Sequence, residues 1–323
     1  MDKYEWFRSA KFGLMIHWGL YCLPAGEWKG QRMDYIGEWI QSKYRIPNAE
    51  YHRLAGIFNP ILFDADEWVR LAKDAGMQYM VVTAKHHEGF AMFRSKADAF
   101  NIVDATPFQR DVIGELANAC ARHGLKLGLY YSQELDWSEP NGGGYGRGHT
   151  NYGMSWTNDW DFPDNEHKNY TQCFEDKIKP QVRELLTNYG DLCLIWFDTP
   201  YVISPQQSRE LADMVHTLQP NCLVNSRIGN GMGDYRSWGD NQIPDEQMPE
   251  GLFETPATLN DTWGYKSFDN NWKDPEKVLG IKQHLNERGI NYLLNVGPDY
   301  LGRIPAPAAE ILRRVGQASR RDS

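Results

Sequence analysis

The sequence lacks the features that define several large classes of protein. It has only five cysteines in 323 residues, and none of them form a Cys-x-x-Cys pair. Neither a disulfide framework nor a zinc site of the usual spacing is therefore expected. No apolar run approaches the roughly 18 residues of a membrane-spanning helix, and residues 1–6 lack the basic and then apolar pattern of a signal peptide. These absences predict reduced thiols and a cytoplasmic protein.

Positive charge is also scarce. The chain has 34 Lys and Arg residues against 43 Asp and Glu residues, a formal net charge of −9. Nucleic acids and anionic membranes bind cationic surfaces, so neither is an expected partner. Aromatic residues, in contrast, are abundant, with 12 Trp and 17 Tyr. This is more than a core of this size requires, and it directs attention to a binding site.

Short apolar runs alternate with segments of helical pattern, which is typical of repeated strand–helix units. Nearly continuous apolar strands are buried on both faces, as in parallel sheets, and no Gly-x-Gly-x-x-Gly motif follows the first run. We therefore predict an α/β fold, an irregular (β/α)8-like TIM barrel, as a single domain over residues 1–317, with a polar tail at 318–323. The predicted strands are 12–17, 79–83, 125–130, 193–197, 223–225 and 292–296, and Pro180 is predicted to kink a long helix at about 165–189.

In such a barrel the functional side chains project from the carboxyl ends of the strands. Those ends carry imidazoles, carboxylates, a guanidinium and indole rings, which suit a pyranose: aromatic faces stack on its C–H groups and polar groups bind its hydroxyls. Two carboxylates can hydrolyse a glycosidic bond. Asp198 stands out because it ends an apolar run, although the pattern alone equally allows a helix-capping or loop acid. The strand-end segments are His17-Trp18, His86-His87-Glu88, Tyr130-Tyr131, Trp196-Phe197-Asp198, Asn225-Ser226-Arg227, Phe253-Glu254 and Asn295.

The adjacent His86 and His87 also raise the question of a metal site. Neighbours on a strand point to opposite faces, so both could bind one ion only beyond the end of the strand. Metal-dependent barrels typically carry His-x-His after the first strand, whereas this chain has a lone His17, which on its own fits a buried core histidine. We expect no metal and no other cofactor, and a metal-dependent barrel hydrolase is kept as an alternative.

Six strings of sequence, in the same order, resemble the α-L-fucosidases of glycoside hydrolase family 29. The resemblance extends from Trp6 to about Gly316. It implies a retaining exo-glycosidase that removes terminal α-L-fucose from a fucosylated glycan through a covalent fucosyl-enzyme, without metal. Because a sugar alcohol can intercept any covalent glycosyl-enzyme in place of water, transfucosylation is an alternative to hydrolysis. A non-catalytic fucose-binding barrel is the second alternative. The strings are Lys11–Gly19, Gly37–Trp39, Ala84–Phe90, Gly128–Ser132, Leu194–Asp198 and Asn291–Pro298.

The resemblance also implies roles for individual residues. Asp198, the acid of the Trp-Phe-Asp motif, is the expected nucleophile. Glu254 is the expected general acid/base because it precedes a Trp-Gly-Tyr string, although Phe253 replaces the Trp that usually comes before it; Glu246 and Glu250 compete for this role. The residues expected to bind fucose are His17, Glu38, Trp39, His86, His87, Tyr131, Trp196 and Arg227.

Two departures from the family pattern carry further expectations. Thr199-Pro200 follows the nucleophile where many relatives have glycine, which associates the chain with the branch that favours α1,3- and α1,4-linked fucose. Relatives also continue into a C-terminal β-sandwich, whereas the resemblance here ends near Gln317. A homo-oligomer would cover the barrel surface that a missing sandwich leaves bare.

Overall fold

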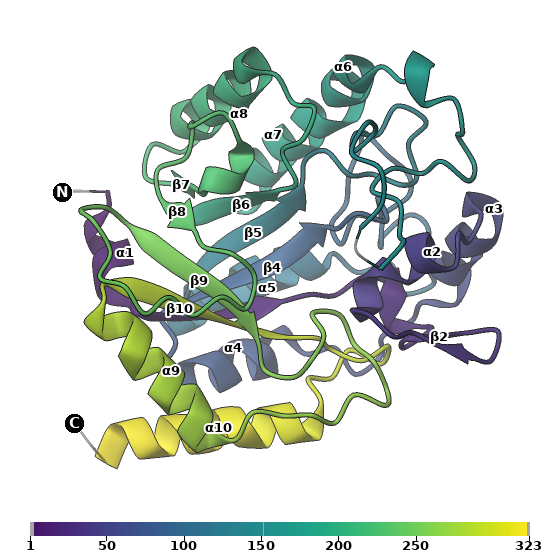
Figure 1. Cartoon of the computed structure of the whole chain (residues 1–323). Helices are drawn as coiled ribbons and strands as arrows, with labels where there is room; N and C mark the ends of the chain where they lie inside the picture. Colours follow the sequence, from purple (N-terminus) through teal and green to yellow (C-terminus); the bar gives the residue numbers. More distant parts are fainter. Residues whose placement is uncertain (1–2, 151, 322–323) are drawn as a thin grey trace.

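The computed structural model describes residues 3–150 and 152–321. Its centre is a sheet of eight parallel strands in the spatial order β7-β6-β5-β4-β1-β10-β9-β8. Asn225 and Tyr235 form a parallel bridge between the two edges, so the sheet curls into a barrel (Figure 1). The predicted α/β, TIM-like fold is confirmed. The strands are β1 (Phe12–Ile16), β4 (Tyr79–Lys85), β5 (Lys126–Ser132), β6 (Leu194–Asp198), β7 (Leu223–Val224), β8 (Arg236–Ser237), β9 (Phe253–Thr258) and β10 (Ile290–Val296).

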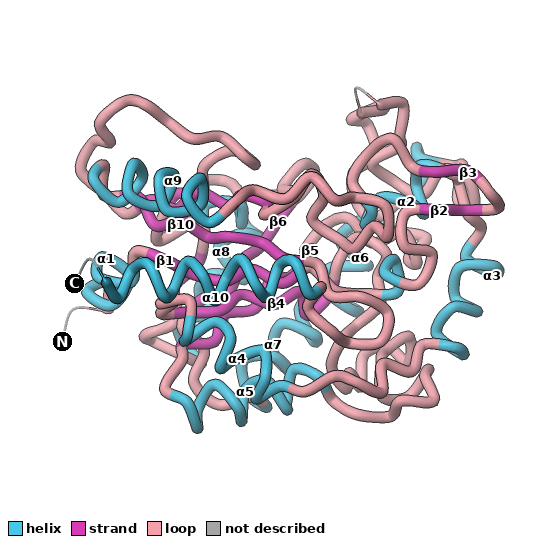
Figure 2. Tube along the Cα trace, turned by 90° about the horizontal axis from the view of Figure 1, so that it is seen from below, coloured by secondary structure: helices cyan, strands magenta, loops and turns pink. Residues whose placement is uncertain are grey.

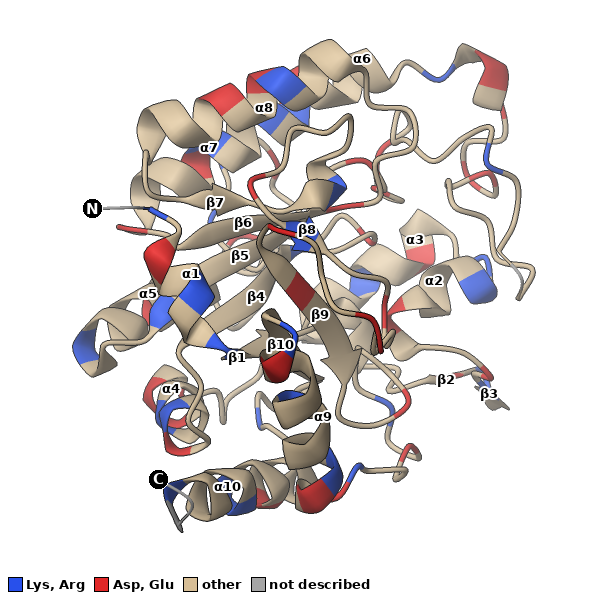
Figure 3. Cartoon of the chain, turned by 60° about the vertical axis from the view of Figure 1, so that its left-hand side comes forward, with Lys and Arg blue, Asp and Glu red and all other residues tan. Residues whose placement is uncertain are grey.

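Amphipathic helices surround the barrel, and their starts follow from local capping chemistry. Asp64, Asp111, Ser204 and Asp274 each accept a hydrogen bond from a backbone N–H in the first turn of the helix that they begin. Charged side chains lie mostly on these helices and on the loops, while the strands are largely uncharged (Figure 3). The helices are α1 (Glu5–Ala10), α4 (Ala65–Asp74), α5 (Val112–His123), α8 (Pro205–Leu218), α9 (Pro275–Glu287) and α10 (Ala306–Arg321).

The segment predicted as one long helix near 165–189 is divided. It consists of the short helix α6 (Tyr170–Cys173), a π-helical turn (Phe174–Ile178) and α7 (Lys179–Asn188). Pro180 lies in the first turn of α7, where its missing N–H costs little, so the irregularity falls just before the proline rather than at it. No helix in the described part of the chain is both long and apolar enough to cross a membrane.

The loops at the carboxyl ends of the strands are long and carry short elements of their own: the hairpin of β2 (Glu27–Trp28) and β3 (Gln31–Arg32) and the helices α2 (Ile40–Lys43) and α3 (Asn48–Tyr51). This loop-rich half lies apart from the helices α9 and α10 (Figure 2). The long segment that follows β5, residues 133–150 and 152–164, belongs to it.

A buried cluster of ion pairs anchors this long loop to the barrel. The Lys177 ammonium, on the π-helical turn, lies 2.6 Å from Asp98, 3.0 Å from Asp136 and 3.1 Å from Glu139. Asp136 also binds Lys85 of β4 over 2.8 Å. Because Lys85, Asp136 and Lys177 are all buried, each of these charges depends on its partners for solvation. The cluster therefore fixes where the loop leaves β5.

Candidate active site

A narrow cavity of about 330 Å³, including the space at its mouth, opens at the carboxyl ends of β1, β4, β5 and β6. It gathers most of the residues to which the resemblance assigned a role and adds five to which it assigned none. The predicted residues in its lining are His17, Glu38, Trp39, His86, His87, Trp196, Asp198 and Arg227, and the additional ones are Met15, Ile36, Tyr130, Asp240 and Trp263.

The hydrogen bonds of two histidines fix their tautomers. His17 Nδ1 lies 2.7 Å from Asn295 Oδ1, and the amide of Asn295 donates to the Trp263 carbonyl, so His17 Nδ1 carries the proton. His87 Nδ1 lies 2.7 Å from the Ser132 hydroxyl, which donates its own proton to the Leu135 carbonyl, so His87 Nδ1 is the donor as well. In each ring Nε2 is left as a hydrogen-bond acceptor.

Burial keeps these imidazoles neutral. Desolvation lowers the pKa of His17 to about 4, and it lowers the pKa values of His86 and His87 well below the ordinary range. A neutral imidazole can accept a hydrogen bond from a hydroxyl, whereas an imidazolium can only donate. The three rings together therefore form an acceptor surface for hydroxyl groups.

Glu38 and Trp39 enter the cavity from the 3-10 turn that precedes α2. Glu38 Oε2 accepts a hydrogen bond from the Gly264 N–H over 2.8 Å, and burial raises the pKa of Glu38 to about 7. The indole of Trp39 meets the His87 ring edge-on, with centroids 5.4 Å apart. This wall offers a carboxylate beside an aromatic surface, the combination that a sugar requires.

Asp198 ends β6 and is held from two sides. The Tyr130 hydroxyl donates to Asp198 Oδ2 over 2.8 Å, and Arg227 Nη1 donates to Oδ1 over 3.1 Å. The Arg227 guanidinium also lies 4.6 Å from the ring centroid of Trp196. The carboxylate is thus oriented by a phenol and a cation while 15% of its side chain stays exposed to the cavity.

A second carboxylate shares the same guanidinium. Arg227 Nη2 donates to Asp240 Oδ1 and, over 2.9 Å, to the Trp238 carbonyl. Asp198 and Asp240 therefore stand within the span of one planar group, and both line the cavity. Asp240 is the more open of the two, with 51% of its side chain exposed against 15% for Asp198. Asp240 was not predicted as a site residue, although it lies in the same irregular loop as Glu246 and Glu250.

The structure corrects the assignment of Tyr131. Successive residues on β5 face opposite sides of the barrel wall, and it is Tyr130 that lines the cavity. The Tyr131 hydroxyl instead donates to Gln181 of α7 over 2.7 Å, and the Lys85 ammonium lies 4.7 Å from its ring centroid. Tyr131 therefore packs between the barrel and its outer helices, and Tyr130 occupies the cavity position that was predicted for Tyr131.

The structure also argues against Glu254 as the acid that faces Asp198. The sequence pattern predicts Glu254 at the carboxyl end of a strand, whereas β9 begins at Phe253, so Glu254 lies at the amino end of this strand. Its side chain is fully buried beneath the indole of Trp196 and does not line the cavity. The competing residues Glu246 and Glu250 are exposed on the loop before β9 and do not line the cavity either.

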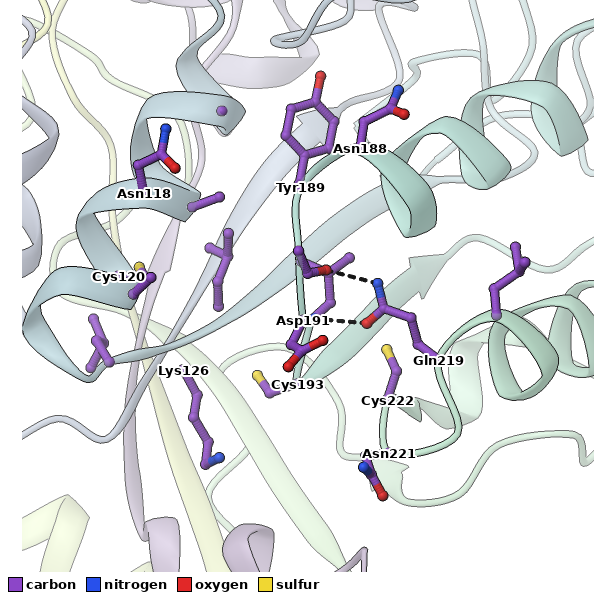
Figure 4. A pocket seen from close by; sticks show the side chains of 18 of the residues that line it. Asn118, Cys120, Lys126, Asn188, Tyr189, Asp191, Cys193, Gln219, Asn221 and Cys222 are labelled. Carbon is purple, nitrogen blue, oxygen red and sulfur yellow. Dashed lines mark hydrogen bonds between the residues drawn. The ribbon is translucent and has the colours of Figure 1, made fainter.

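A larger cavity, of about 1630 Å³ including its mouth, lies at the opposite end of the barrel, between α5, the start of β6 and the start of β7 (Figure 4). Among the described residues that line it, Asp191 is the only one with a carboxylate, and Cys120, Cys193 and Cys222 contribute thiols. Burial raises the pKa of all three thiols, so they remain protonated. The described lining of this cavity lacks the two acids that glycoside hydrolysis requires, so the smaller cavity is the candidate active site.

The sequence profile of the family described as "Alpha-L-fucosidase" matches residues 1–321. The chain is 55% identical to alpha-L-fucosidase AlfC from Lactobacillus casei, solved with α-L-fucose, with a TM-score of 0.96 and coverage of 100% of this chain and 99% of that one. It is 30% identical to rat tissue alpha-L-fucosidase and 29% identical to a putative alpha-L-fucosidase of Caenorhabditis elegans, over 97% of this chain in each case. The chain spans only 67% and 64% of the length of these two relatives. The chain belongs to the α-L-fucosidase family of glycoside hydrolases.

Proposed function

We propose that this chain is a retaining exo-α-L-fucosidase that hydrolyses terminal α-L-fucosides by double displacement. One observation carries the proposal: Asp198 and Asp240 are held by the two ends of a single guanidinium at the mouth of a narrow, hydroxyl-accepting cavity. A retaining glycosidase requires a nucleophilic carboxylate and an acid/base carboxylate close together on one sugar-sized site.

In the first step, Asp198 Oδ2 or Oδ1 attacks the anomeric carbon while protonated Asp240 donates its proton to the leaving glycosidic oxygen. The C–O bond to the aglycone breaks as the fucosyl ester forms. In the second step, Asp240, now a carboxylate, takes a proton from water, and the water oxygen displaces Asp198. Two inversions give net retention. The greater exposure of Asp240 supports its role, because the aglycone leaves and water enters on the open side.

The rest of the cavity suits one fucose residue. The Nε2 atoms of His17 and His87 and the carboxyl group of Glu38 provide acceptors for ring hydroxyls. Trp39 and Trp263 provide aromatic surface for the C–H groups and the C6 methyl. Enclosure by these walls favours a terminal sugar over an internal one, which is why we propose exo action.

The sequence of this chain and its similarity to AlfC favour different fucose linkages. The Thr199-Pro200 motif favours α1,3- and α1,4-linked fucose, whereas AlfC, which is about 55% identical to this chain, has been solved with Fucα(1,6)GlcNAc. We propose α1,6-linked fucose as the first substrate class to test, because that similarity covers 98% of this chain. Product analysis on α1,2-, α1,3-, α1,4- and α1,6-fucosylated oligosaccharides gives the order of preference. The same reactions with added sugar alcohols reveal transfucosylation.

The decisive experiment compares Asp198→Ala with Asp240→Ala on 4-nitrophenyl fucoside and on a fucosyl disaccharide with a poor leaving group. Asp198→Ala should lose turnover on both substrates, and azide should yield fucosyl azide of inverted configuration. Asp240→Ala should lose roughly 10²–10⁴-fold on the poor leaving group and far less on 4-nitrophenol, with azide yielding the retained product. Wild-type turnover of the disaccharide by Asp240→Ala would refute its role.

The same assays separate the alternatives. A fucose-binding barrel without catalysis would bind fucose but release no 4-nitrophenol. A metal-dependent hydrolase would lose activity on dialysis against a chelator and regain it with metal. The proposed mechanism predicts release of 4-nitrophenol that chelation does not change.

A further inference from the structure

The carboxyl group of Glu254 is held by three donors inside the barrel. Its Oε1 accepts from Trp196 Nε1 over 2.8 Å and from the Tyr235 hydroxyl over 3.4 Å, and its Oε2 accepts from the Tyr79 hydroxyl over 2.6 Å. The three donors come from β4, from β6 and from the residue before β8. Glu254, itself on β9, therefore ties four parts of the barrel wall together below the cavity.

The indole that Glu254 holds is the support for both groups that orient Asp198. The Tyr130 ring stacks on Trp196 with centroids 5.5 Å apart and planes within 20° of parallel. The Arg227 guanidinium lies 4.6 Å from the Trp196 ring centroid. Tyr130 and Arg227 are also the two donors to the Asp198 carboxylate. A rotation of the indole would therefore move both of these donors.

We propose that Glu254 is a positioning residue for the fucosidase reaction: it fixes the Trp196 indole through Nε1 and so holds Tyr130 and Arg227 in place around Asp198. The inference rests on the proposed function and assigns Glu254 no contact with substrate. The indole N–H can only donate, and among the described residues its hydrogen-bond acceptor is Glu254 Oε1. Without that acceptor a buried N–H would be left unsatisfied, and the indole would lose its fixed orientation.

The ionisation of Glu254 is consistent with this role. Burial raises the pKa of its carboxyl to about 7, while hydrogen bonds from Tyr79, Trp196 and Tyr235 act in the opposite direction. An ionised carboxylate accepts from all three donors, and a neutral amide oxygen can still accept from Nε1. Glu254→Gln should therefore preserve the bond to Trp196, whereas Glu254→Leu should remove it.

The first test is kinetic and uses both 4-nitrophenyl fucoside and a fucosyl disaccharide. Glu254→Leu should lower kcat/KM at least tenfold and by the same factor on the two substrates, and Glu254→Gln should recover most of that loss. A loss confined to the poor leaving group, or recovery of Glu254→Ala by azide, would mean that Glu254 is the acid/base and would overturn the proposal. Equal losses in Glu254→Gln and Glu254→Leu would overturn it as well.

A double-mutant cycle identifies the route through the indole. Trp196→Phe keeps an aromatic ring but lacks the N–H, so in that background Glu254→Leu should change kcat/KM by less than twofold. Independent, multiplicative losses would overturn the proposal. Tyr79→Phe is the matched control, because it removes a donor to Glu254 without altering Trp196, and it should cost less than Glu254→Leu.

A spectroscopic readout does not depend on activity. In protein labelled with ¹⁵N-tryptophan, the indole N–H signal that disappears in Trp196→Phe is that of Trp196. It should move strongly in Glu254→Leu and little in Glu254→Gln; an unmoved signal in Glu254→Leu would refute the bond. If the wild-type chain proved inactive on fucosides, the proposed function would fail while this signal would still report on the bond.

Discussion

Tyr130 and Tyr131 are neighbours in the chain whose hydroxyls serve opposite sides of the barrel wall. Tyr130 donates to Asp198 inside the cavity, and Tyr131 donates to Gln181 on an outer helix. Both rings are buried, so burial does not distinguish them. The partner of each hydroxyl does, and it gives each tyrosine a separate role.

The two tyrosines therefore make a matched pair of variants. Tyr130→Phe should lower kcat about tenfold or more, because the loss of a hydrogen bond to a charged group costs about 1.5–3 kcal/mol. Tyr131→Phe should leave kcat within about twofold and instead lower the melting temperature, since it leaves Gln181 Oε1 without its donor. Steady-state kinetics and thermal unfolding on both variants check this, and a larger kinetic loss in Tyr131→Phe would contradict it.

Acid should destabilise the fold through His17. Its folded pKa is lowered to about 4 by burial, while an unfolded histidine titrates near 6.5. Between these values the unfolded chain binds more protons, so the free energy of unfolding rises with pH from about 4 to 6.5 and is level above that. The titration of His17 accounts for about 3 kcal/mol of this rise in the free energy of unfolding.

The measurement is urea unfolding at several pH values on wild type, His17→Gln and the exposed-residue control His167→Gln. The rise between pH 4 and 6.5 should be smaller in His17→Gln than in the other two proteins. An identical pH profile in all three proteins would contradict this prediction, because it would mean that the pKa of His17 is the same in the folded and unfolded states.

The buried ion-pair cluster should dominate the stability of the long loop after β5. Lys177 pairs with Asp98, Asp136 and Glu139 while its side chain is 4% exposed. Lys177→Met leaves these acids without one of their cations and should cost about 3–5 kcal/mol. Lys179→Met removes exposed pairs two residues away and should cost about 1 kcal/mol or less. Similar losses from the two variants would contradict this account.

The residue after Asp198 is strained. Thr199 has φ of 60°, a left-handed conformation that disfavours a β-branched side chain, and its hydroxyl donates to the Asp198 carbonyl over 2.7 Å. Thr199→Gly relieves the strain in the folded protein but makes the unfolded chain more flexible. Because these effects oppose each other, the free energy of unfolding of this variant should stay within about 1 kcal/mol of wild type. Thr199→Val keeps the strain, loses the hydrogen bond and should be about 1 kcal/mol less stable. Equal melting temperatures for Gly and Val variants would argue against strain at this position.

The strands that could be predicted from the sequence are those composed mainly of apolar residues. Runs such as Tyr79–Val82 and Cys193–Phe197 are apolar throughout because both faces of the sheet are covered. β9 could not be found this way, since Phe253–Thr258 contains a proline, an acid and two threonines. The sequence pattern places Phe253-Glu254 at the carboxyl end of a strand, and the resemblance assigns Glu254 the acid/base role from the Trp-Gly-Tyr string that follows it. In the structure β9 instead begins at Phe253, so Glu254 lies away from the cavity.

Among the cavity residues, too, some could be predicted from the sequence and others could not. His17, His86 and Asp198 follow directly from predicted strand ends, so their convergence could be foreseen. Whether Tyr130 or Tyr131 faces inward depends on the pleat of β5, which a single-residue shift reverses. Asp240 is brought to the cavity by Arg227, 13 positions earlier in the sequence, and by a loop without periodicity, so no local pattern marks it.

The barrel is joined most sparsely beside the two acids. β7 and β8 have two residues each, and they are joined by a bridge between the flanking residues Asn225 and Tyr235 and by backbone hydrogen bonds to the Val224 carbonyl. Arg227 lies just beyond one side of this join and Asp240 just beyond the other. Their ion pair therefore links the two edges of the sheet where few backbone hydrogen bonds do so. The interaction that positions the two reactive acids thus also helps to close the barrel.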